Sequence, residues 1–283
     1  MSTVCVVTGA AGAMGTACAL ALAPSADVIV LTDLDESRLA TAAATVERAS
    51  TTKVEAMPGD IAAVAFVEQL AARADALGEL WALVHTAGLS PTMADWREIL
   101  RVDLGAVCIL LDTFVERVTS GSVAVCVASI AGRLGSFDPA MDDVCDNPLA
   151  DDFEQRFTAL AGSAPDPGMS YRLAKRAVIR RCERAAVGWG ERGGRVLSLS
   201  PGLIDTPMGR LELEHNEVKK WMAELTPVGG DRSTIDVVLP GQADDIAQTV
   251  AFLASERAAF ISGCDILVDG GLLAAMRQRS PAT

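Results

Sequence analysis

The sequence predicts a single α/β domain, a doubly wound parallel sheet of seven strands with helices on both faces. Short β-branched runs alternate with longer Ala/Leu-rich segments along most of the chain, which is the βαβα order that produces such a sheet. A glycine-rich turn directly follows the first run, as expected where a strand leads into the first helix of this architecture. The 283 residues, 50% of them hydrophobic, suffice for one large core, so residues 1–283 are interpreted as one domain.

Seven segments have the near-continuous apolar character of strands that are covered on both faces. They are residues 4–8, 28–31, 53–57, 81–85, 122–128, 195–200 and 265–268. Helical patterns of ordinary length lie between them, among them residues 36–49, 61–77, 171–189 and 243–254. Two segments break the rhythm and, as long irregular segments often are, are expected to be functional. Residues 133–169 are acidic and loop-like, and are expected to be an active-site insertion; residues 203–241 are expected to form a substrate lid.

Charge and cysteine usage restrict the partners. The net charge is −13, from 37 acidic and 24 basic residues, which disfavours nucleic acid and anionic membranes and favours a small-molecule substrate. No run is long and apolar enough to span a bilayer. The seven cysteines form no Cys-x-x-Cys pair and are interpreted as reduced core residues, which indicates a cytoplasmic protein.

The turn after the first strand reads Thr-Gly-Ala-Ala-Gly-Ala-Met-Gly over residues 8–15. Gly9, Gly12 and Gly15 permit a tight turn and let the backbone approach a pyrophosphate at the following helix N-terminus. In this strand–turn–helix context the pattern predicts the dinucleotide site of a Rossmann fold. The alternative is a glycine-rich turn that serves packing only.

Two carboxylates follow the second and third strands. Asp33 lies 24 residues after Gly9, where dinucleotide sites place an acidic residue on the ribose hydroxyls, so NAD is expected rather than NADP. Asp33 could instead begin a turn or cap the helix near Asp35. Asp60 is a candidate for contact with adenine or, equally, for a helix cap.

Tyr171 is the only tyrosine, and it is followed four residues later by Lys175, one of four lysines. This spacing places both side chains on one helix face. A phenol is a poor base at neutral pH, but a nearby ammonium favours the phenolate and makes it a usable acid/base. A solvated surface pair is the alternative. Ser129 follows the strand at 122–128 and would point to the ligand crevice, although on its own it could be an ordinary loop serine.

Taken together, these residues resemble the short-chain dehydrogenases/reductases, in the correct order and over nearly the whole chain. Further matching motifs are Ala87-Gly88, Pro201-Gly202 with Thr206 and Met208, and Val-Asp-Gly-Gly at residues 268–271. The resemblance implies an NAD(H)-dependent oxidoreductase that interconverts a secondary alcohol and a ketone, with Ser129, Tyr171 and Lys175 catalytic. It implies no metal, because the cofactor carries the hydride, and a homodimer or homotetramer.

The resemblance also assigns the cofactor contacts. Lys175 would bind the nicotinamide ribose, and Ile204 with Thr206 would hold the carboxamide. The full set is Gly9, Gly12, Met14, Gly15, Asp33, Leu34, Asp60, Ile61, Ala87, Gly88, Tyr171, Lys175, Pro201, Gly202, Ile204 and Thr206.

The chain departs from the family pattern at three places. Ala13 replaces a glycine of the turn, and His85-Thr86 replaces an Asn-Asn pair. Asp103 stands where the family commonly has a catalytic asparagine, and it is kept as a fourth catalytic candidate. Its negative charge would raise the pKa of Tyr171 if the two are close, which would shift activity to higher pH.

Ser129 and Tyr171 are 42 positions apart, farther than is typical of the family. A similar insertion, with the motifs at 147–149, 189–191 and 270–277, resembles the 3α-hydroxysteroid dehydrogenase/carbonyl reductase subgroup. A bulky alicyclic or steroid-like alcohol is therefore expected, in a pocket with apolar walls. The candidates for that wall are Leu134, Phe137, Met169, Leu203, Met208, Leu211 and Trp221. Alternatively, these residues fold the insertion onto itself.

Two other functions are compatible with the fold. A non-catalytic dinucleotide-binding sensor would keep the glycine turn and Asp33 but would need neither Tyr171 nor Lys175. A sugar epimerase or dehydratase on the same fold resembles longer chains with a separate substrate domain. Retention of Ser129, Tyr171 and Lys175 together favours the oxidoreductase.

Overall fold

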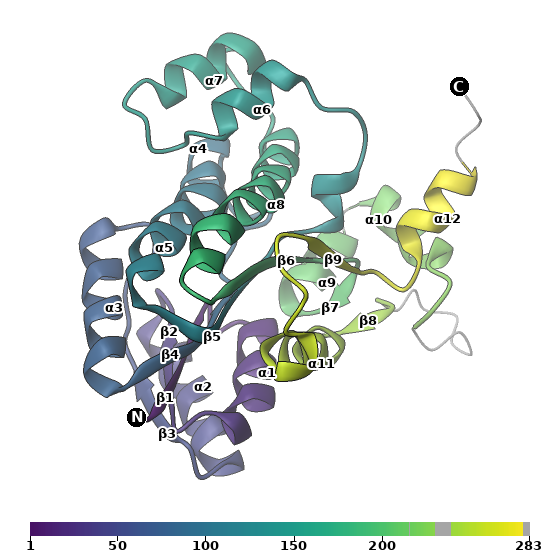
Figure 1. Ribbon diagram of the computed structural model, residues 1–283. Coiled ribbons are helices and arrows are strands. Elements are labelled where there is room, and N and C mark those ends of the chain that lie inside the picture. Colours follow the sequence, from purple (N-terminus) through teal and green to yellow (C-terminus); the bar gives the residue numbers. More distant parts are fainter. Residues whose placement is uncertain (215, 230–238, 280–283) are drawn as a thin grey trace.

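The protein was analysed as a computed structural model that describes residues 1–214, 216–229 and 239–279. Seven parallel strands form one sheet in the order β3-β2-β1-β4-β5-β6-β9 (Figure 1). They are β1 (Thr3–Thr8), β2 (Val28–Thr32), β3 (Lys53–Ala56), β4 (Glu79–His85), β5 (Val118–Val127), β6 (Arg195–Pro201) and β9 (Asp265–Val268). The predicted Rossmann fold is confirmed. The strand order reverses between β1 and β4, which is where this fold opens its ligand crevice.

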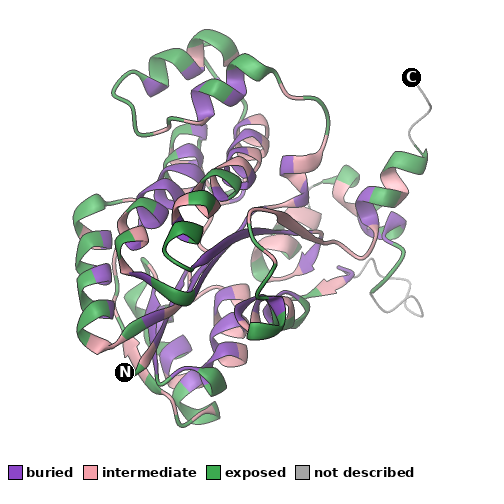
Figure 2. Ribbon diagram, viewed as in Figure 1, coloured by how far each residue is buried: buried purple, intermediate pink, exposed green. Residues whose placement is uncertain are grey.

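Helices cover both faces of the sheet because the strands are apolar on both. Val4 and Val6 of β1 point into one core, and Cys5 and Val7 point into the other, as the two-residue repeat of a strand requires. Buried residues therefore run along both sides of the strands (Figure 2). The first core is closed by α3 (Val64–Leu77), α5 (Ala106–Phe114) and α8 (Pro167–Glu191), the second by α1 (Ala13–Leu22), α2 (Glu36–Ala49) and α11 (Ala243–Ala254).

Side-chain caps explain where two helices begin. α8 starts at Pro167, earlier than predicted, because Asp166 accepts a hydrogen bond from the Met169 N–H at 2.8 Å and proline suits the first helical position. α3 starts at Val64, later than predicted, because the Asp60 carboxylate accepts from the Ala62 N–H at 2.9 Å and holds a turn there.

The segment at 133–169 is helical, and the expectation of a loop-like segment is wrong. It forms α6 (Pro139–Cys145) and α7 (Phe153–Ala161) before entering α8. Phe157 of α7 is fully buried, and its ring stacks on Trp96 of α4 (Trp96–Leu100) with centroids 5.6 Å apart. The two helices thus dock beside α4 and α8, at the top of Figure 1.

Ion pairs reinforce this docking. Arg176 of α8 makes two hydrogen bonds of 2.8 Å to Asp142 of α6, and Arg180 makes two of 3.0 and 2.6 Å to Asp146. The arginines and the aspartates are each four residues apart, so each pair lies on one helix face. Paired guanidinium–carboxylate contacts are the strong form of this interaction.

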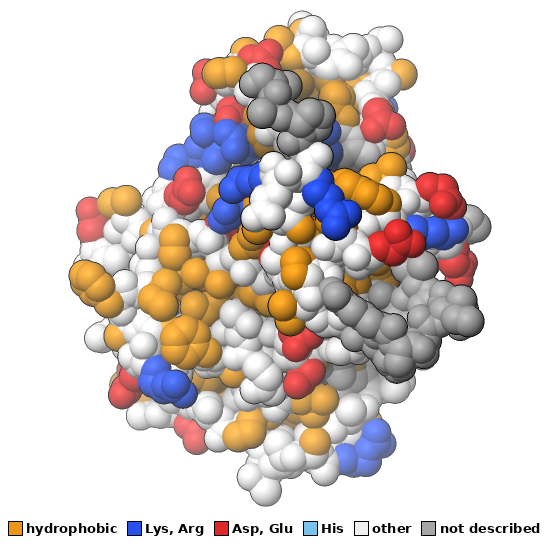
Figure 3. All heavy atoms as spheres, turned by 90° about the vertical axis from the view of Figure 1, so that its right-hand side faces the viewer, with side chains coloured by type: hydrophobic (Ala, Val, Ile, Leu, Met, Phe, Trp, Pro, Cys, Tyr) orange, Lys and Arg blue, Asp and Glu red, His pale blue; other side chains and the backbone are white. Residues whose placement is uncertain are grey.

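A short parallel pair, β7 (Ile204–Asp205) and β8 (Gly241–Gln242), forms a second sheet, and the remaining helices and helical turns complete the described fold. They are α9 (Pro207–Glu214), α10 (Glu217–Leu225), α12 (Leu272–Arg279), the 3₁₀ turns η1 (Ala23–Ser25), η3 (Val115–Arg117), η4 (Ile130–Arg133) and η5 (Glu256–Ala258), and the π-helical turn η2 (Arg101–Gly105). His215 and residues 230–238 of the predicted lid lie outside the described residues. Basic and acidic side chains are interspersed on the face shown in Figure 3. None of the helices in the described ranges has the length and apolar character that crossing a membrane requires.

Candidate active site

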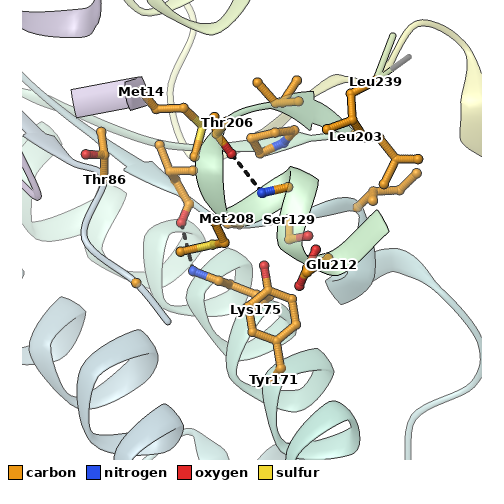
Figure 4. A pocket seen from close by; sticks show the side chains of 18 of the residues that line it. Met14, Thr86, Ser129, Tyr171, Lys175, Leu203, Thr206, Met208, Glu212 and Leu239 are labelled. Carbon is orange, nitrogen blue, oxygen red and sulfur yellow. Dashed lines mark hydrogen bonds between the residues drawn. The ribbon is translucent and has the colours of Figure 1, made fainter. Parts of the chain in front are cut away.

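A pocket lies at the carboxyl ends of the central strands, between the sheet and α9 (Figure 4). Many of the predicted site residues line it: Met14, Gly88, Ser129, Tyr171, Lys175, Pro201, Gly202, Ile204 and Thr206. The predicted contacts at Gly9, Gly12, Gly15, Asp33, Leu34, Asp60, Ile61 and Ala87 are not among the lining residues. They belong to the glycine turn and to the segments that follow β2, β3 and β4.

In the glycine turn, two glycines are required by close backbone packing, and the third precedes an uncapped helix N-terminus. Gly9 has φ +68°, and a Cβ there would lie 2.4 Å from the Ala87 backbone nitrogen; a Cβ at Gly15 would lie 2.1 Å from the Gly9 oxygen. These two positions therefore require glycine for packing. Gly12 is different, since its Cβ would meet only the Gly9 oxygen, at 3.2 Å, and it begins α1 without a side-chain cap. The start of α1 thus fits a pyrophosphate, which uncapped helix N–H groups bind.

Asp33 is held beside this turn. Its carboxylate accepts hydrogen bonds from the Ala11 N–H at 3.0 Å and the Asp35 N–H at 3.2 Å. The N-cap of α2 is Asp35, not Asp33. Asp60 is not a helix cap either, because the N-cap of α3 is Ala63; its second oxygen pairs with Arg101 at 2.8 Å. The Asp33 carboxylate is therefore fixed beside the glycine turn by two backbone N–H groups.

Ser129, Tyr171 and Lys175 converge from two elements. Ser129 follows β5, and its Oγ accepts from the Ala131 N–H at 3.1 Å. Interaction with the Ser129 hydroxyl lowers the pKa of the Tyr171 phenol. Lys175 lies one turn further along α8, with Nζ 5.5 Å from the centre of the tyrosine ring. Figure 4 shows the Tyr171 hydroxyl facing the Ser129 side of the pocket. The surface-pair interpretation of Tyr171 and Lys175 therefore does not hold.

Asp103 completes this group from the π-helical turn η2. Its Oδ2 lies 3.2 Å from Lys175 Nζ, and its Oδ1 accepts from the Leu89 N–H at 2.7 Å. The Asp103 side chain is 0% exposed and that of Lys175 is 6% exposed. Lys175 also donates to the Val127 carbonyl at 3.4 Å. The carboxylate therefore orients the ammonium beneath the phenol.

Comparison with known proteins supports one family. The profile of the short chain dehydrogenases matches residues 3–140, and that of the enoyl-(acyl carrier protein) reductases matches residues 157–273. The short-chain dehydrogenase/reductase bsc3 of Alternaria brassicicola is 30% identical over 277 residues, which cover 93% of each chain. The chain belongs to the short-chain dehydrogenase/reductase family. Members are oxidoreductases that bind a nicotinamide dinucleotide and act on the CH–OH groups of small molecules.

Two further relatives agree with this family. The 3-alpha-hydroxysteroid dehydrogenase/carbonyl reductase of Comamonas testosteroni is 28% identical over 203 residues, or 69% of this chain and 73% of that protein. Its name is that of the subgroup that the sequence resembles. A short-chain type dehydrogenase/reductase from Mycobacterium ulcerans has the same fold, with a TM-score of 0.75 and 22% identity over 96% of this chain and 90% of that one.

In this family member, the charges around Tyr171 oppose one another. Burial is the largest effect and raises the pKa of Tyr171. The Lys175 ammonium and the Ser129 hydroxyl lower this pKa, whereas the Asp103 and Glu212 carboxylates raise it. The result is a raised pKa of Tyr171. Burial lowers the pKa of Lys175, but attraction to Asp103 and Tyr171 outweighs it and the pKa is raised. Burial raises the pKa of Asp103 against the pull of Lys175. Asp103 thus acts on the phenol in the predicted direction.

His85-Thr86, another departure from the family pattern, joins β4 to β1. The buried His85 Nδ1 lies 2.7 Å from the Thr8 hydroxyl oxygen, and the Thr86 hydroxyl donates to the Thr8 carbonyl at 2.8 Å. Burial, helped by Lys175, lowers the pKa of His85 to about 3, so the ring is uncharged at neutral pH. In the described part of the chain, no three His, Cys, Asp or Glu side chains are grouped to hold a metal ion.

The predicted apolar wall is assembled only in part. Leu203 and Met208 line the pocket, while Leu211 and Trp221 are 40% and 42% exposed on other faces of α9 and α10. Phe137 and Met169 pack in the core of the insertion, and Leu134 packs near α12. No residue of 133–169, all of which the structure describes, lines the pocket. The insertion residues therefore pack against α4 and α8 and near α12, and not into the pocket.

Sequence reasoning missed several of the lining residues, among them two apolar and two charged side chains. Ile130 and Leu239 add apolar surface, and Glu212 and Lys219 add a pair of opposite charges. Leu239 and Lys219 belong to the segment at 203–241, which was expected to cover the substrate. No motif marks Glu212 or Lys219, because their meeting depends on how α9 and α10 pack.

Proposed function

We propose that this protein is an NAD(H)-dependent oxidoreductase that interconverts a secondary alcohol and a ketone, with Tyr171 as the acid/base. One observation carries the proposal: the Tyr171 phenol lines the same pocket as Ser129, its hydroxyl faces Ser129 (Figure 4), and the Lys175 ammonium lies one helical turn away. A structural tyrosine would need neither partner. The arrangement matches the requirement that an acid/base be within hydrogen-bond reach of the proton it moves.

Each side chain has a separate task in this proposal. NAD, when bound, supplies the hydride acceptor for alcohol oxidation, and NADH the donor for ketone reduction. Ser129 holds the substrate oxygen by a hydrogen bond, and Tyr171 removes the hydroxyl proton during oxidation or returns it during reduction. Lys175 favours the phenolate form by its positive charge. Asp103 positions Lys175, and it also reduces the effect of the ammonium on the phenol.

The cofactor preference is proposed from Asp33. A carboxylate fixed beside the glycine turn accepts hydrogen bonds from the ribose hydroxyls of NAD but repels the 2′-phosphate of NADP, which favours NAD over NADP. Arg38 donates a hydrogen bond to the Ala11 carbonyl at 3.2 Å, so a guanidinium group also lies near the glycine turn. Asp33→Asn is therefore expected to raise kcat/KM with NADP by at least about tenfold, since like-charge contacts cost several kcal/mol. An unchanged NAD/NADP ratio would remove Asp33 as the basis of the preference.

The substrate is proposed to be a bulky alicyclic alcohol or ketone. Ile130, Leu203, Met208 and Leu239 give the pocket apolar sides, which suits a hydrocarbon ring. The printed name of the Comamonas testosteroni relative points the same way. We further propose a cytoplasmic homodimer or homotetramer, because the reduced cysteines and the family resemblance favour these.

The direct experiment mixes the purified protein with NAD and a panel of secondary alcohols, among them cyclohexanols and hydroxysteroids, and follows the absorbance of NADH. Turnover of alicyclic members is expected. Tight NAD binding with no turnover of any alcohol, and none of the matching ketones with NADH, would contradict the proposal and favour a dinucleotide sensor.

A further inference from the structure

A pair of opposite charges lies in the pocket and has no task in the proposed proton transfer. Glu212 is on α9 and Lys219 on α10, and both line the pocket. Lys219 Nζ donates to Glu212 Oε2 at 3.1 Å, and the two side chains are 26% and 17% exposed, respectively. In Figure 4 the Glu212 carboxylate lies on the same side of the pocket as the Tyr171 hydroxyl and Ser129.

The position of Glu212 is unfavourable for catalysis by Tyr171 alone. Its negative charge raises the pKa of the phenol, and thereby opposes the form that accepts a proton. If the ion pair served only to join α9 to α10, it could do so outside the pocket. A carboxylate that works against the acid/base therefore calls for a reason on the substrate side.

Glu212 also has capacity left for a ligand. A carboxylate accepts hydrogen bonds at two oxygens, and within the described ranges the only hydrogen bond to Glu212 is the one from Lys219 to Oε2. Lys219 fixes the carboxylate through Oε2, and no described residue donates a hydrogen bond to Oε1. Because a carboxylate only accepts, its complement is a hydroxyl or another donor, and a substrate carboxylate would be repelled.

Resting on the proposed function, we propose that Glu212 is a specificity residue that accepts a hydrogen bond from a second hydroxyl of the substrate. The preferred substrates are then alicyclic diols, or the corresponding hydroxyketones, rather than simple alcohols. The first hydroxyl lies between Ser129 and Tyr171, and the second lies against Glu212. The apolar ring between them contacts Leu203 and Met208. A simple alcohol leaves Glu212 without this partner, which costs binding because a partly buried acceptor stays unsatisfied.

The test compares the kcat/KM for cyclohexanediols with that for cyclohexanol, with NAD, in the wild type and in variants. Glu212→Ala is expected to lower the diol/cyclohexanol ratio by about 10- to 100-fold, mainly through KM, since hydrogen bonds to charged groups are of this strength. Cyclohexanol turnover should persist. Glu212→Gln keeps an acceptor and should retain part of the preference. Glu214→Ala, an exposed carboxylate on the same helix, is the matched control and should leave the ratio unchanged.

The outcomes separate this inference from the proposed function. An unchanged ratio in Glu212→Ala, with cyclohexanol oxidation intact and still abolished by Tyr171→Phe, overturns the role of Glu212 and leaves the proposed function standing. Absence of turnover for every alcohol in the wild type overturns the proposed function and this inference with it. A preference for 2-aminocyclohexanol that is lost in Glu212→Ala, while the diol ratio stays constant, would assign the site to an ammonium and overturn the diol assignment.

Discussion

The insertion at 133–169 and the predicted lid at 203–241 were both expected to lie over the substrate, and they behave differently. The insertion folds into α6 and α7 and docks on α4 and α8, away from the pocket. The second segment supplies Ile204, Met208, Glu212 and Lys219 to the pocket. Being next to the active-site serine in the sequence therefore does not determine where an insertion packs. Its place is determined by the surface against which it can bury its apolar side chains.

The largest expected effect tests whether the insertion is a stabilising element separate from catalysis. Phe157→Ala removes a fully buried ring that stacks on Trp96, and should lower the free energy of unfolding by about 3–5 kcal/mol. Urea unfolding measures this change. At a temperature where the variant is folded, kcat/KM should stay within about threefold of the wild type.

Leu160→Ala, on the same helix and 47% exposed, is the control and should change stability by less than about 0.5 kcal/mol. If folded Phe157→Ala lost most of its activity, the separation between the two regions would be disproved.

A smaller effect is expected in the segment at 203–241. There a substitution should weaken substrate binding and leave stability nearly unchanged, the reverse of Phe157→Ala. Met208→Ala removes apolar surface from the pocket and should raise KM for an alicyclic alcohol by about tenfold, the value of one or two buried methylenes. Its stability should change by less than about 1.5 kcal/mol, because Met208 is only partly buried. Leu211→Ala, on α9 but outside the pocket, provides the comparison. Equal KM values for the two variants would count against Met208 as a substrate contact.

The smallest effect concerns η2, where the two regions meet. Leu104 packs in the core that holds the insertion, while its neighbour Asp103 reaches Lys175. Asp103→Asn removes a charge that raises the pKa of Tyr171. The phenolate then forms at lower pH, so the acidic limb of the pH profile of kcat/KM for alcohol oxidation should move to lower pH. Superimposable profiles of the variant and the wild type would exclude this role.

The sequence predicted the sheet and the grouping of Ser129, Tyr171 and Lys175 for one physical reason. The carboxyl ends of parallel strands share an edge of the sheet. A residue after β5 and a helix packed on that strand therefore lie close together, regardless of the length of the sequence between them. The helical insertion was missed because α6 and α7 are short, with 7 and 9 residues. In retrospect, Asp138-Pro139 is a helix-start signal. The Glu212–Lys219 pair has no such signal, because two helices must first pack before the charges meet.

The central claim, that Tyr171 exchanges the proton while a dinucleotide lies beside it, has one direct test. NADH formation from an alicyclic alcohol is measured with the wild type and with Tyr171→Phe, together with the affinity of each for NAD. The account predicts a loss of at least about a hundredfold in kcat, as removal of an acid/base typically causes, with NAD affinity within a few-fold of the wild type. An unchanged rate in Tyr171→Phe would contradict it.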